Sequence, residues 1–140
     1  MRALRCVVLV AIAAGIGCKR EPNLCPKGME PMKDRATDGK SVWCKSKDGA
    51  TVQWIELWEG GTERRQTCIY RSGKIEGRFF GWHKGGNHWI EGQYRSGEKE
   101  GLWTQWDKDG HKVAEGEYRT GQLVGGAPVG MVARCETMKP

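Results

Sequence analysis

The cysteines and histidines are the residues of this 140-residue chain best suited to metal binding or catalysis, and their spacing supports neither. None of the six cysteines forms a C-x-x-C pair, and no histidine pair follows a cysteine pair at the separation of a zinc finger. His83 and His88 are five residues apart, which places them on opposite faces of a strand. His111 stands beside a polar turn. We therefore expect surface histidines and no metal.

Carboxylates and glycine-rich stretches make no better case for catalysis. Glu91 and Glu115 occur at equivalent positions 24 residues apart, so we interpret them as cross-strand charge pairs on a solvated face. The glycine-rich stretches, such as YRSGEKEG at 94–101, lack the phosphate-cradling pattern G-x-x-x-x-G-K-[ST]. No Ser/His/Asp or Cys/His set is suggested by spacing. The sequence predicts no enzyme, no catalytic residue and no cofactor.

The first seventeen residues are typical of an export signal. Arg2 and Arg5 precede an apolar run that is shorter than the roughly 20 residues needed to span a bilayer. The stretch GIGC, which ends at Cys18, resembles the lipobox of bacterial lipoproteins. That resemblance implies cleavage before Cys18, a diacylglyceryl group on its sulfur and a lipid anchor in the cell or outer membrane, facing the periplasm or the surface. The alternative is ordinary signal-peptidase cleavage that leaves Cys18 as a free thiol.

The charge of the mature chain is modest. Without Arg2 and Arg5, 21 of the 23 basic side chains remain against 17 acidic ones, and the signs are interspersed. This balance fits a solvated surface with some attraction to anionic lipid or polysaccharide. It does not favour nucleic-acid binding.

A unit of 24 residues recurs along the middle of the chain. Tyr70, Tyr94 and Tyr118 each open a Y-R-[ST]-G stretch, and other residues keep the same offset: Trp58, Trp82 and Trp106; Ile55, Phe79 and Trp103; Gly77, Gly101 and Gly125. The repetition extends from Cys44 to Gly125, with a one-residue shift around Gly60 and Gly61. Periods of this length indicate solenoids, propellers or stacked hairpins.

Each unit is predicted to form one β-hairpin. Residues 101–106, GLWTQW, and residues 111–119, HKVAEGEYR, read as strands around the turn DKDG, and Thr120–Gly121 forms a second turn. No window has an apolar helical stripe. Gly116 lies two residues before Tyr118 on the same strand face, so its missing side chain would leave room for an aromatic ring from a neighbouring strand. We expect an all-β fold, an elongated antiparallel sheet of stacked hairpins.

The repeat resembles a known family, the MORN-type repeats, in the variant found in bacterial exported proteins and antitoxin components. The resemblance implies an elongated, twisted single sheet used for binding or spacing, without a catalytic site, and phospholipid binding has been proposed for some members. The pattern is carried by Gly101, Trp103, Trp106, Gly110, Glu115, Gly116, Tyr118, Gly121 and Gly125.

The chain is thus expected to comprise a signal peptide at 1–17, an anchor linker and the start of a capping hairpin at 18–41, repeats at 42–125 and a tail at 126–140. Four cysteines of the mature chain predict two disulfides, with three possible connectivities. The candidates are Cys25, Cys44, Cys68 and Cys135.

Strand spacing favours one disulfide connectivity. Cys44 and Cys68 occupy equivalent sites two strand spacings apart, about 9.6 Å, which exceeds the reach of a disulfide. We therefore favour Cys25–Cys44, which would close a capping hairpin whose strands lie near residues 29–32 and 41–44. By default Cys68 is left for Cys135, and that bridge requires the tail to fold back across the sheet.

An aromatic surface is the most promising candidate for function. Plain alternation places the Trp82 row and the Phe79 row on opposite faces, and a single sheet cannot bury both. One row would then bind a sugar, a lipid or a protein, unless the tail and long basic side chains shield it. The candidate residues are Trp58, Trp82, Trp106, Phe79 and Trp103.

The expected function is non-enzymatic: an exported lipoprotein that acts as a binding or spacer module at the cell envelope. Its partners would be the membrane, through the lipid anchor, and a protein, phospholipid or glycan ligand. The alternative is an immunity- or antitoxin-like protein that restrains a specific enzyme or toxin.

Overall fold

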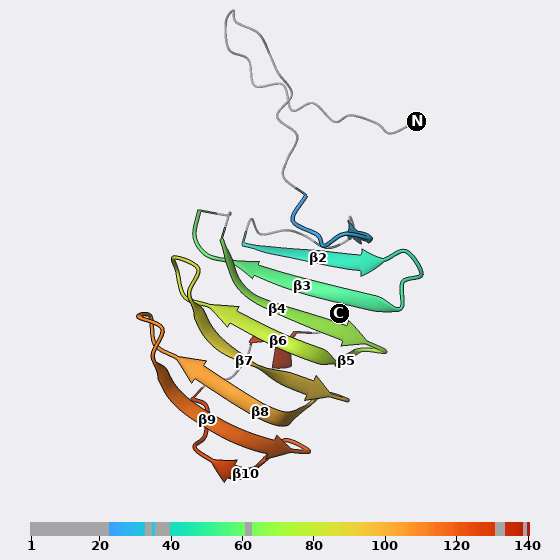
Figure 1. Cartoon of the computed structure of the whole chain (residues 1–140). Coiled ribbons are helices and arrows are strands. Elements are labelled where there is room, and N and C mark those ends of the chain that lie inside the picture. Colours follow the sequence, from blue (N-terminus) through green and yellow to red (C-terminus); the bar gives the residue numbers. More distant parts are fainter. Residues whose placement is uncertain (1–22, 33–34, 36–39, 61–62, 131–133, 139) are drawn as a thin grey trace, which may run out of the picture.

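The chain folds into a single open antiparallel sheet, as predicted from its sequence. The computed structural model describes residues 23–32, 35, 40–60, 63–130, 134–138 and 140. The predicted signal peptide and the lipidation site Cys18 lie outside these residues. Figure 1 shows the sheet as one curved layer, with a short 3-10 helix near the C-terminus lying against one of its faces.

The sheet has ten strands, and nearly all neighbours in space are neighbours in sequence. Its order is β1-β2-β3-β4-β6-β7-β8-β9-β10, and β5 pairs with β4 beside this path. The strands are β1 (Met29–Pro31), β2 (Ser41–Ser46), β3 (Thr51–Leu57), β4 (Arg64–Arg71), β5 (Lys74–Ile75), β6 (Gly77–Trp82), β7 (His88–Arg95), β8 (Glu98–Trp106), β9 (Lys112–Arg119) and β10 (Gln122–Gly126), followed by the 3-10 helix η1 (Arg134–Glu136).

Tight turns with left-handed backbone join the strands at one end of the sheet. In each two-residue turn a hydroxyl residue and the glycine after it both have positive φ, which matches the twist of the flanking strands. These turns are Ser72–Gly73, Ser96–Gly97 and Thr120–Gly121, with φ of 50°, 53° and 48° at the first residue. Their 24-residue spacing follows from the Y-R-[ST]-G stretches.

A bulge breaks the register near the opposite end of three hairpins. In each case one strand carries an extra residue between two paired ones: Arg65, Trp89 and Val113, again 24 residues apart. These bulges lie on the partner strands β4, β7 and β9, so side chains alternate regularly from Phe79 to Trp82 on β6 and from Trp103 to Trp106 on β8. Phe79 and Trp82 therefore face opposite sides of the sheet, as plain alternation predicts. A separate register shift between β7 and β8 lies between Glu91 and Gln93.

The main core lies on one side of the sheet, which we call the covered face. Seven aromatic rings form a ladder across the strands: Trp43, Trp54, Tyr70, Phe79, Tyr94, Trp103 and Tyr118. Neighbouring rings pack edge-to-face or offset, such as Tyr94 against Trp103 with centroids 5.0 Å apart. Such pairs contribute about 0.5–1.5 kcal/mol each beyond their buried area.

Glycine makes room for one of these rings, as the sequence predicts. A Cβ atom on Gly92 would lie 2.1–2.6 Å from three ring atoms of Trp103, so the indole rests directly on the Gly92 backbone. At Gly116 the prediction of an aromatic ring is wrong, because the atoms that fill the space there are the Ala127 carbonyl oxygen and the Leu123 side chain. The glycine is thus required for packing in both hairpins, although different atoms occupy the gap.

The N-terminal region packs against β2 and β3 on the side of the sheet opposite the covered face. β1 pairs antiparallel with β2, and Cys25 lies at disulfide distance from Cys44, with Cα atoms 5.7 Å apart. Around this pair a second, smaller core contains Ile55 and Leu57. The capping hairpin and its favoured cysteine pair thus have the predicted arrangement.

Candidate binding surfaces

The histidines do not converge on a catalytic site. His83 Nε2 lies 3.0 Å from the carbonyl oxygen of Trp106, while His111 is exposed and lies 3.4 Å from Asp107. The Asp107 carboxylate accepts hydrogen bonds from the backbone N–H groups of His111 and Asp109. Mainly through the bond from His111, these contacts lower the pKa of Asp107 and cap the turn. No three His, Cys, Asp or Glu side chains of the described residues are grouped to hold a metal.

The aromatic residues predicted as candidates for a binding face form two rows on opposite sides of the sheet, as alternation predicts, and the row that contains Phe79 and Trp103 is the covered one. Phe79 and Trp103 are 1% and 0% exposed and belong to the core of the covered face. Each lies three residues before a tryptophan on the same strand, so alternation places Phe79 and Trp103 on the side opposite Trp82 and Trp106. Both of those side chains are only half-buried.

Trp58 also departs from its predicted place. Its Nε1–H donates to the carbonyl oxygen of Trp82, just as His83 Nε2–H donates to the carbonyl oxygen of Trp106. Trp58 is therefore the structural counterpart of His83. The backbone N–H of Trp58 donates to the carbonyl oxygen of Glu63, and that of His83 donates to the carbonyl oxygen of Asn87. The two hydrogen bonds close equivalent loops. The loop after Trp58 is one residue longer, which accounts for the shift around Gly60 and Gly61.

The same shift moves the core position of the first hairpin. Trp54 pairs with Cys68 on the covered face, as Phe79 pairs with Gly92 and Trp103 with Gly116. Ile55, which the sequence alignment equates with Phe79, instead packs on the other side with Cys25 and Cys44.

The side of β6–β9 opposite the covered face, which we call the open face, carries a continuous aromatic row. Phe80 and Trp82 stack along β6 with centroids 6.0 Å apart and an interplanar angle of 24°. The His88 ring meets Trp82 at 6.3 Å and Trp106 at 6.0 Å, in both cases nearly perpendicular. The row thus crosses three adjacent strands. No described segment packs over it, and the His88 side chain is 53% exposed.

Charged groups of both signs border this aromatic row. Glu91 lies 3.7 Å from His88, and Glu115 lies 3.0 Å from Lys112. The guanidinium of Arg78 lies 4.8 Å from the centroid of the Phe80 ring. Glu91 and Glu115 therefore pair within their own strands, and the cross-strand pairing predicted for them is not the arrangement seen. Across strands, Glu115 accepts a hydrogen bond from Thr104.

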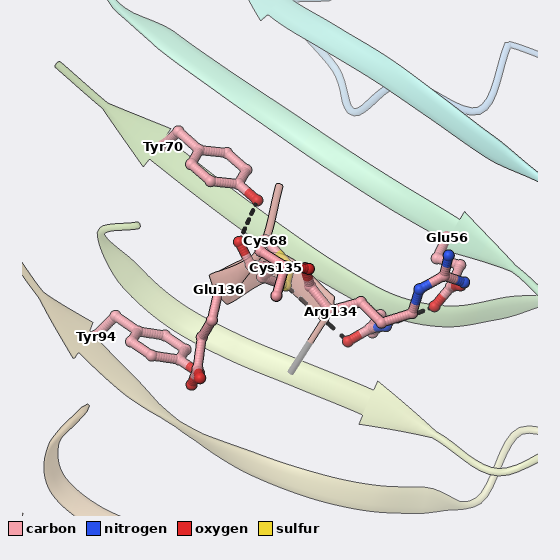
Figure 2. Close-up of a disulfide and its surroundings, with 9 residues drawn as sticks. Glu56, Cys68, Tyr70, Tyr94, Arg134, Cys135 and Glu136 are labelled. Atoms are coloured by element: carbon pink, nitrogen blue, oxygen red, sulfur yellow. Dashed lines mark hydrogen bonds and ion pairs between the residues drawn. A yellow bond between two sulfur atoms is a disulfide. The ribbon is translucent and has the colours of Figure 1, made fainter. Parts of the chain in front are cut away.

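The C-terminal segment, residues 127–130 and 134–138, seals the covered face (Figure 2). Cys135 lies at disulfide distance from Cys68, with Cα atoms 6.0 Å apart, and both are buried. The phenol of Tyr70 donates to the Cys135 carbonyl oxygen, and that of Tyr94 donates to the Glu136 carboxylate. The tail therefore folds back across the sheet, as the pairing of Cys68 with Cys135 required.

Burial under this segment keeps two tyrosines protonated. Burial raises the pKa of Tyr70 well above its ordinary value. Burial also raises the pKa of Tyr94, and its hydrogen bond to the Glu136 carboxylate adds to that effect. Both phenols therefore act as hydrogen-bond donors to the C-terminal segment.

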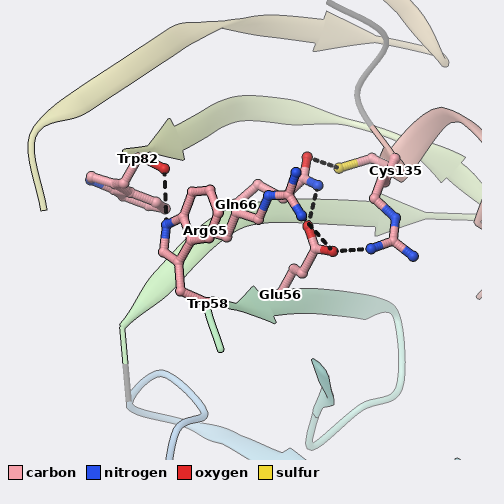
Figure 3. Close-up of polar contacts among 7 residues, drawn as sticks. Glu56, Trp58, Arg65, Gln66, Trp82 and Cys135 are labelled. Atoms are coloured by element: carbon pink, nitrogen blue, oxygen red, sulfur yellow. Dashed lines mark hydrogen bonds and ion pairs between the residues drawn. The ribbon is translucent and has the colours of Figure 1, made fainter. Parts of the chain in front are cut away.

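A buried carboxylate for which no sequence pattern is a signal holds the same segment to β3 (Figure 3). Glu56 is 3% exposed and accepts hydrogen bonds from the Gln66 amide and from Arg134 of η1. Arg65 lies 3.7 Å from the Glu56 carboxylate, while its guanidinium stacks 4.7 Å from the centroid of Trp58. A buried charge of this kind is tolerated because its oxygens are paired.

A hollow of about 260 Å³ lies where the C-terminal segment meets the far strands. It is lined by Tyr94, Gly97, Glu98, Lys99, Tyr118, Gly121 and Glu136. Lys99 covers its aromatic floor, with Nζ 5.1 Å from the Trp103 ring. Its volume is below that of most small-molecule pockets, roughly 300–1,000 Å³. The open face is therefore the better candidate site.

Comparison with protein-family models, with curated proteins and with solved structures gives no match for this chain. None of the helical segments that the structure describes has the length and apolarity to cross a bilayer.

Proposed function

We propose that this protein is a non-enzymatic binding module of the cell envelope, built from MORN-type β-hairpin repeats. The observation that carries the proposal is the difference between its two faces. The covered face is closed by the C-terminal segment, while the open face presents Phe80, Trp82, His88 and Trp106 with no described segment over them. Contiguous exposed aromatic surface is a mark of binding sites.

Export and a lipid anchor at Cys18 are part of the proposal. The two buried cysteine pairs support an oxidising compartment, since disulfides persist in exported proteins. Mass spectrometry of membrane fractions should find a mature chain that begins with acylated Cys18. A soluble mature form that begins elsewhere would refute the anchor.

The proposed absence of catalysis is supported by the separate partners of the histidines: His83 contacts the Trp106 carbonyl oxygen, His88 contacts Glu91, and His111 contacts Asp107. A reaction catalysed by the purified protein and abolished by one point substitution would overturn this part.

The binding role is tested by sedimentation of the mature, non-acylated chain with purified envelope fractions. We expect the wild-type chain to co-sediment and Trp106→Ala to remain in solution, because the indole forms the β8 end of the aromatic row. Val124→Ala is the matched control, since Val124 is 52% exposed on β10 and lies outside the aromatic row. Equal sedimentation of all three proteins would refute a role of the open face.

A second candidate, an immunity- or antitoxin-like protein, is favoured by exposed apolar residues toward the β10 end of the sheet. These are Leu102, Val113, Leu123 and Val124, between 40% and 59% exposed. Leu123 and Val124 lie on the edge strand β10, and apolar side chains at a sheet edge suit a protein partner. Under this candidate, a partner enzyme would lose activity on binding, and Val124→Asp rather than Trp106→Ala would restore it.

A further inference from the structure

The aromatic row of the open face has the spacing of a surface that contacts an extended ligand. Trp82 on β6 and Trp106 on β8 flank His88 on the strand between them. Two strand spacings separate the backbones of the two tryptophans by about 9.6 Å. A ligand that contacts both indoles must therefore be longer than a single ring, and it must run across the strands rather than along them.

Hydrogen-bonding capacity remains free beside the rings. Within the described chain, the indole N–H of Trp82 and that of Trp106 donate no hydrogen bond, whereas the indole N–H of Trp58 is used by the Trp82 carbonyl oxygen. The carboxylates of Glu91 and Glu115 are 35% and 39% exposed, so each keeps acceptor capacity toward solvent. The row thus combines apolar ring surface with donors and acceptors at its border.

The charges at the border argue against a strongly charged ligand. Beside the row, Arg78 lies over the Phe80 ring, Lys112 is paired with Glu115, and Glu91 lies next to His88. These two cations and two carboxylates balance one another. A phosphate or sulfate group at Lys112 would also meet the Glu115 carboxylate, and a cation at Glu115 would meet Lys112. The balance suits a neutral molecule.

A sugar chain has the required properties, since each ring offers an apolar C–H face and a rim of hydroxyl groups. Aromatic side chains that provide the contact area and a few placed polar groups that fix orientation are the usual construction of a selective site. We propose that the open face binds a neutral oligosaccharide, with sugar rings on Trp82 and Trp106 and hydroxyl groups bonded to the indole N–H groups and to Glu91 and Glu115. This inference rests on the proposed binding function.

The test uses the mature chain with both cysteine pairs oxidised, titrated with cellotetraose and with the tetramer of N-acetylglucosamine. Binding is followed by calorimetry and by tryptophan fluorescence. We expect saturable binding of at least one tetramer, and a dissociation constant raised tenfold or more by Trp106→Ala, about 1.4 kcal/mol. Val124→Ala should bind within twofold of the wild type.

A variant that leaves the fold intact keeps the test decisive. His88 is more than half exposed, so His88→Ala should retain the thermal transition while it removes the ring between the two indoles. We expect it to weaken tetramer binding by about threefold to tenfold. Wild-type affinity in His88→Ala and Trp106→Ala, both shown to be folded by circular dichroism, would overturn the proposal.

Two further outcomes separate this inference from the proposed function. If neither tetramer binds while vesicles of phosphatidylglycerol or an envelope protein are retained in a Trp106-dependent manner, the sugar specificity is wrong and the binding function stands. If the open-face variants change neither sugar binding nor sedimentation with envelopes, both proposals fail.

Discussion

The substitution Gly92→Ala tests whether packing in the sheet core requires a glycine at this position. In Gly92→Ala the new methyl group would lie 2.1 Å from the Trp103 ring, and that ring is fully buried between Phe79, Tyr94 and Tyr118. Because the indole cannot move into solvent, the substitution overpacks the core. Overpacking of this kind costs about 1–3 kcal/mol of unfolding free energy. This cost exceeds the stabilisation of about 0.4–1 kcal/mol that alanine gives by restricting the unfolded chain.

Two other glycines provide matched controls, since neither has a positive φ. A Cβ on Gly125 would meet nothing closer than 4.0 Å, so Gly125→Ala should be neutral or slightly stabilising. A Cβ on Gly81 would lie 3.0 Å from Ile90 and 3.1 Å from Trp89, so Gly81→Ala should fall between the two.

The assay is reversible urea unfolding followed by tryptophan fluorescence, supported by thermal melts. A loss of 1–3 kcal/mol corresponds to a decrease in Tm of roughly 4–12 °C for a domain of this size. The losses of stability caused by Trp103→Phe and Gly92→Ala should not add in the double variant, because the smaller ring relieves part of the overlap with the new methyl group. Equal stability of the Gly92 and Gly125 variants would refute the idea that the Trp103 ring requires the glycine.

Three further predictions concern the C-terminal segment. Cys135→Ser removes the bond between Cys68 and Cys135, which are 67 residues apart in the sequence, and should lower the unfolding free energy by about 4 kcal/mol. Urea titrations measure this change. An unchanged unfolding midpoint would show that the disulfide does not form. Tyr70 and Tyr94 have raised pKa values in the folded state, so the folded chain keeps protons that the unfolded chain loses, and stability should fall as the pH rises above about 10. Urea titrations at pH 8 and pH 11 should show this loss, and the double Phe variant should reduce it. Glu56→Gln removes the buried charge that accepts from Arg134 and should cost about 1–3 kcal/mol; a stability equal to that of the wild type would mean that the contact contributes nothing.

The local features of this protein could be predicted because they depend on neighbours in the sequence. The Y-R-[ST]-G stretches determine the left-handed turns, since serine or threonine followed by glycine tolerates two successive positive φ values. Alternation along β6 and β8 separates Phe79 from Trp82. Even the pairing of Cys25 with Cys44 followed from strand spacing.

The candidate site could be predicted only in part, because it depends on which face the chain covers. Alternation places Trp82 and Trp106 on one face and Phe79 and Trp103 on the other, but both rows are aromatic, so the sequence does not show which row is buried. Only the packing of residues 127–130 and 134–138 against one face decides which pair is buried and which stays half-exposed. His88 was recognised as a surface residue, but its position between two indoles depends on the bulge at Trp89.

By itself the sequence determined the hairpins, their turns and the glycine gaps, since these arise from backbone sterics within a few residues. The tertiary structure decided the position of Trp58 and the burial of Glu56. The first depends on a loop one residue longer than its counterparts. The second depends on Arg134, which is 78 residues away in the sequence. Contacts over such distances have no local signal, because they form only when the tail docks on a completed sheet.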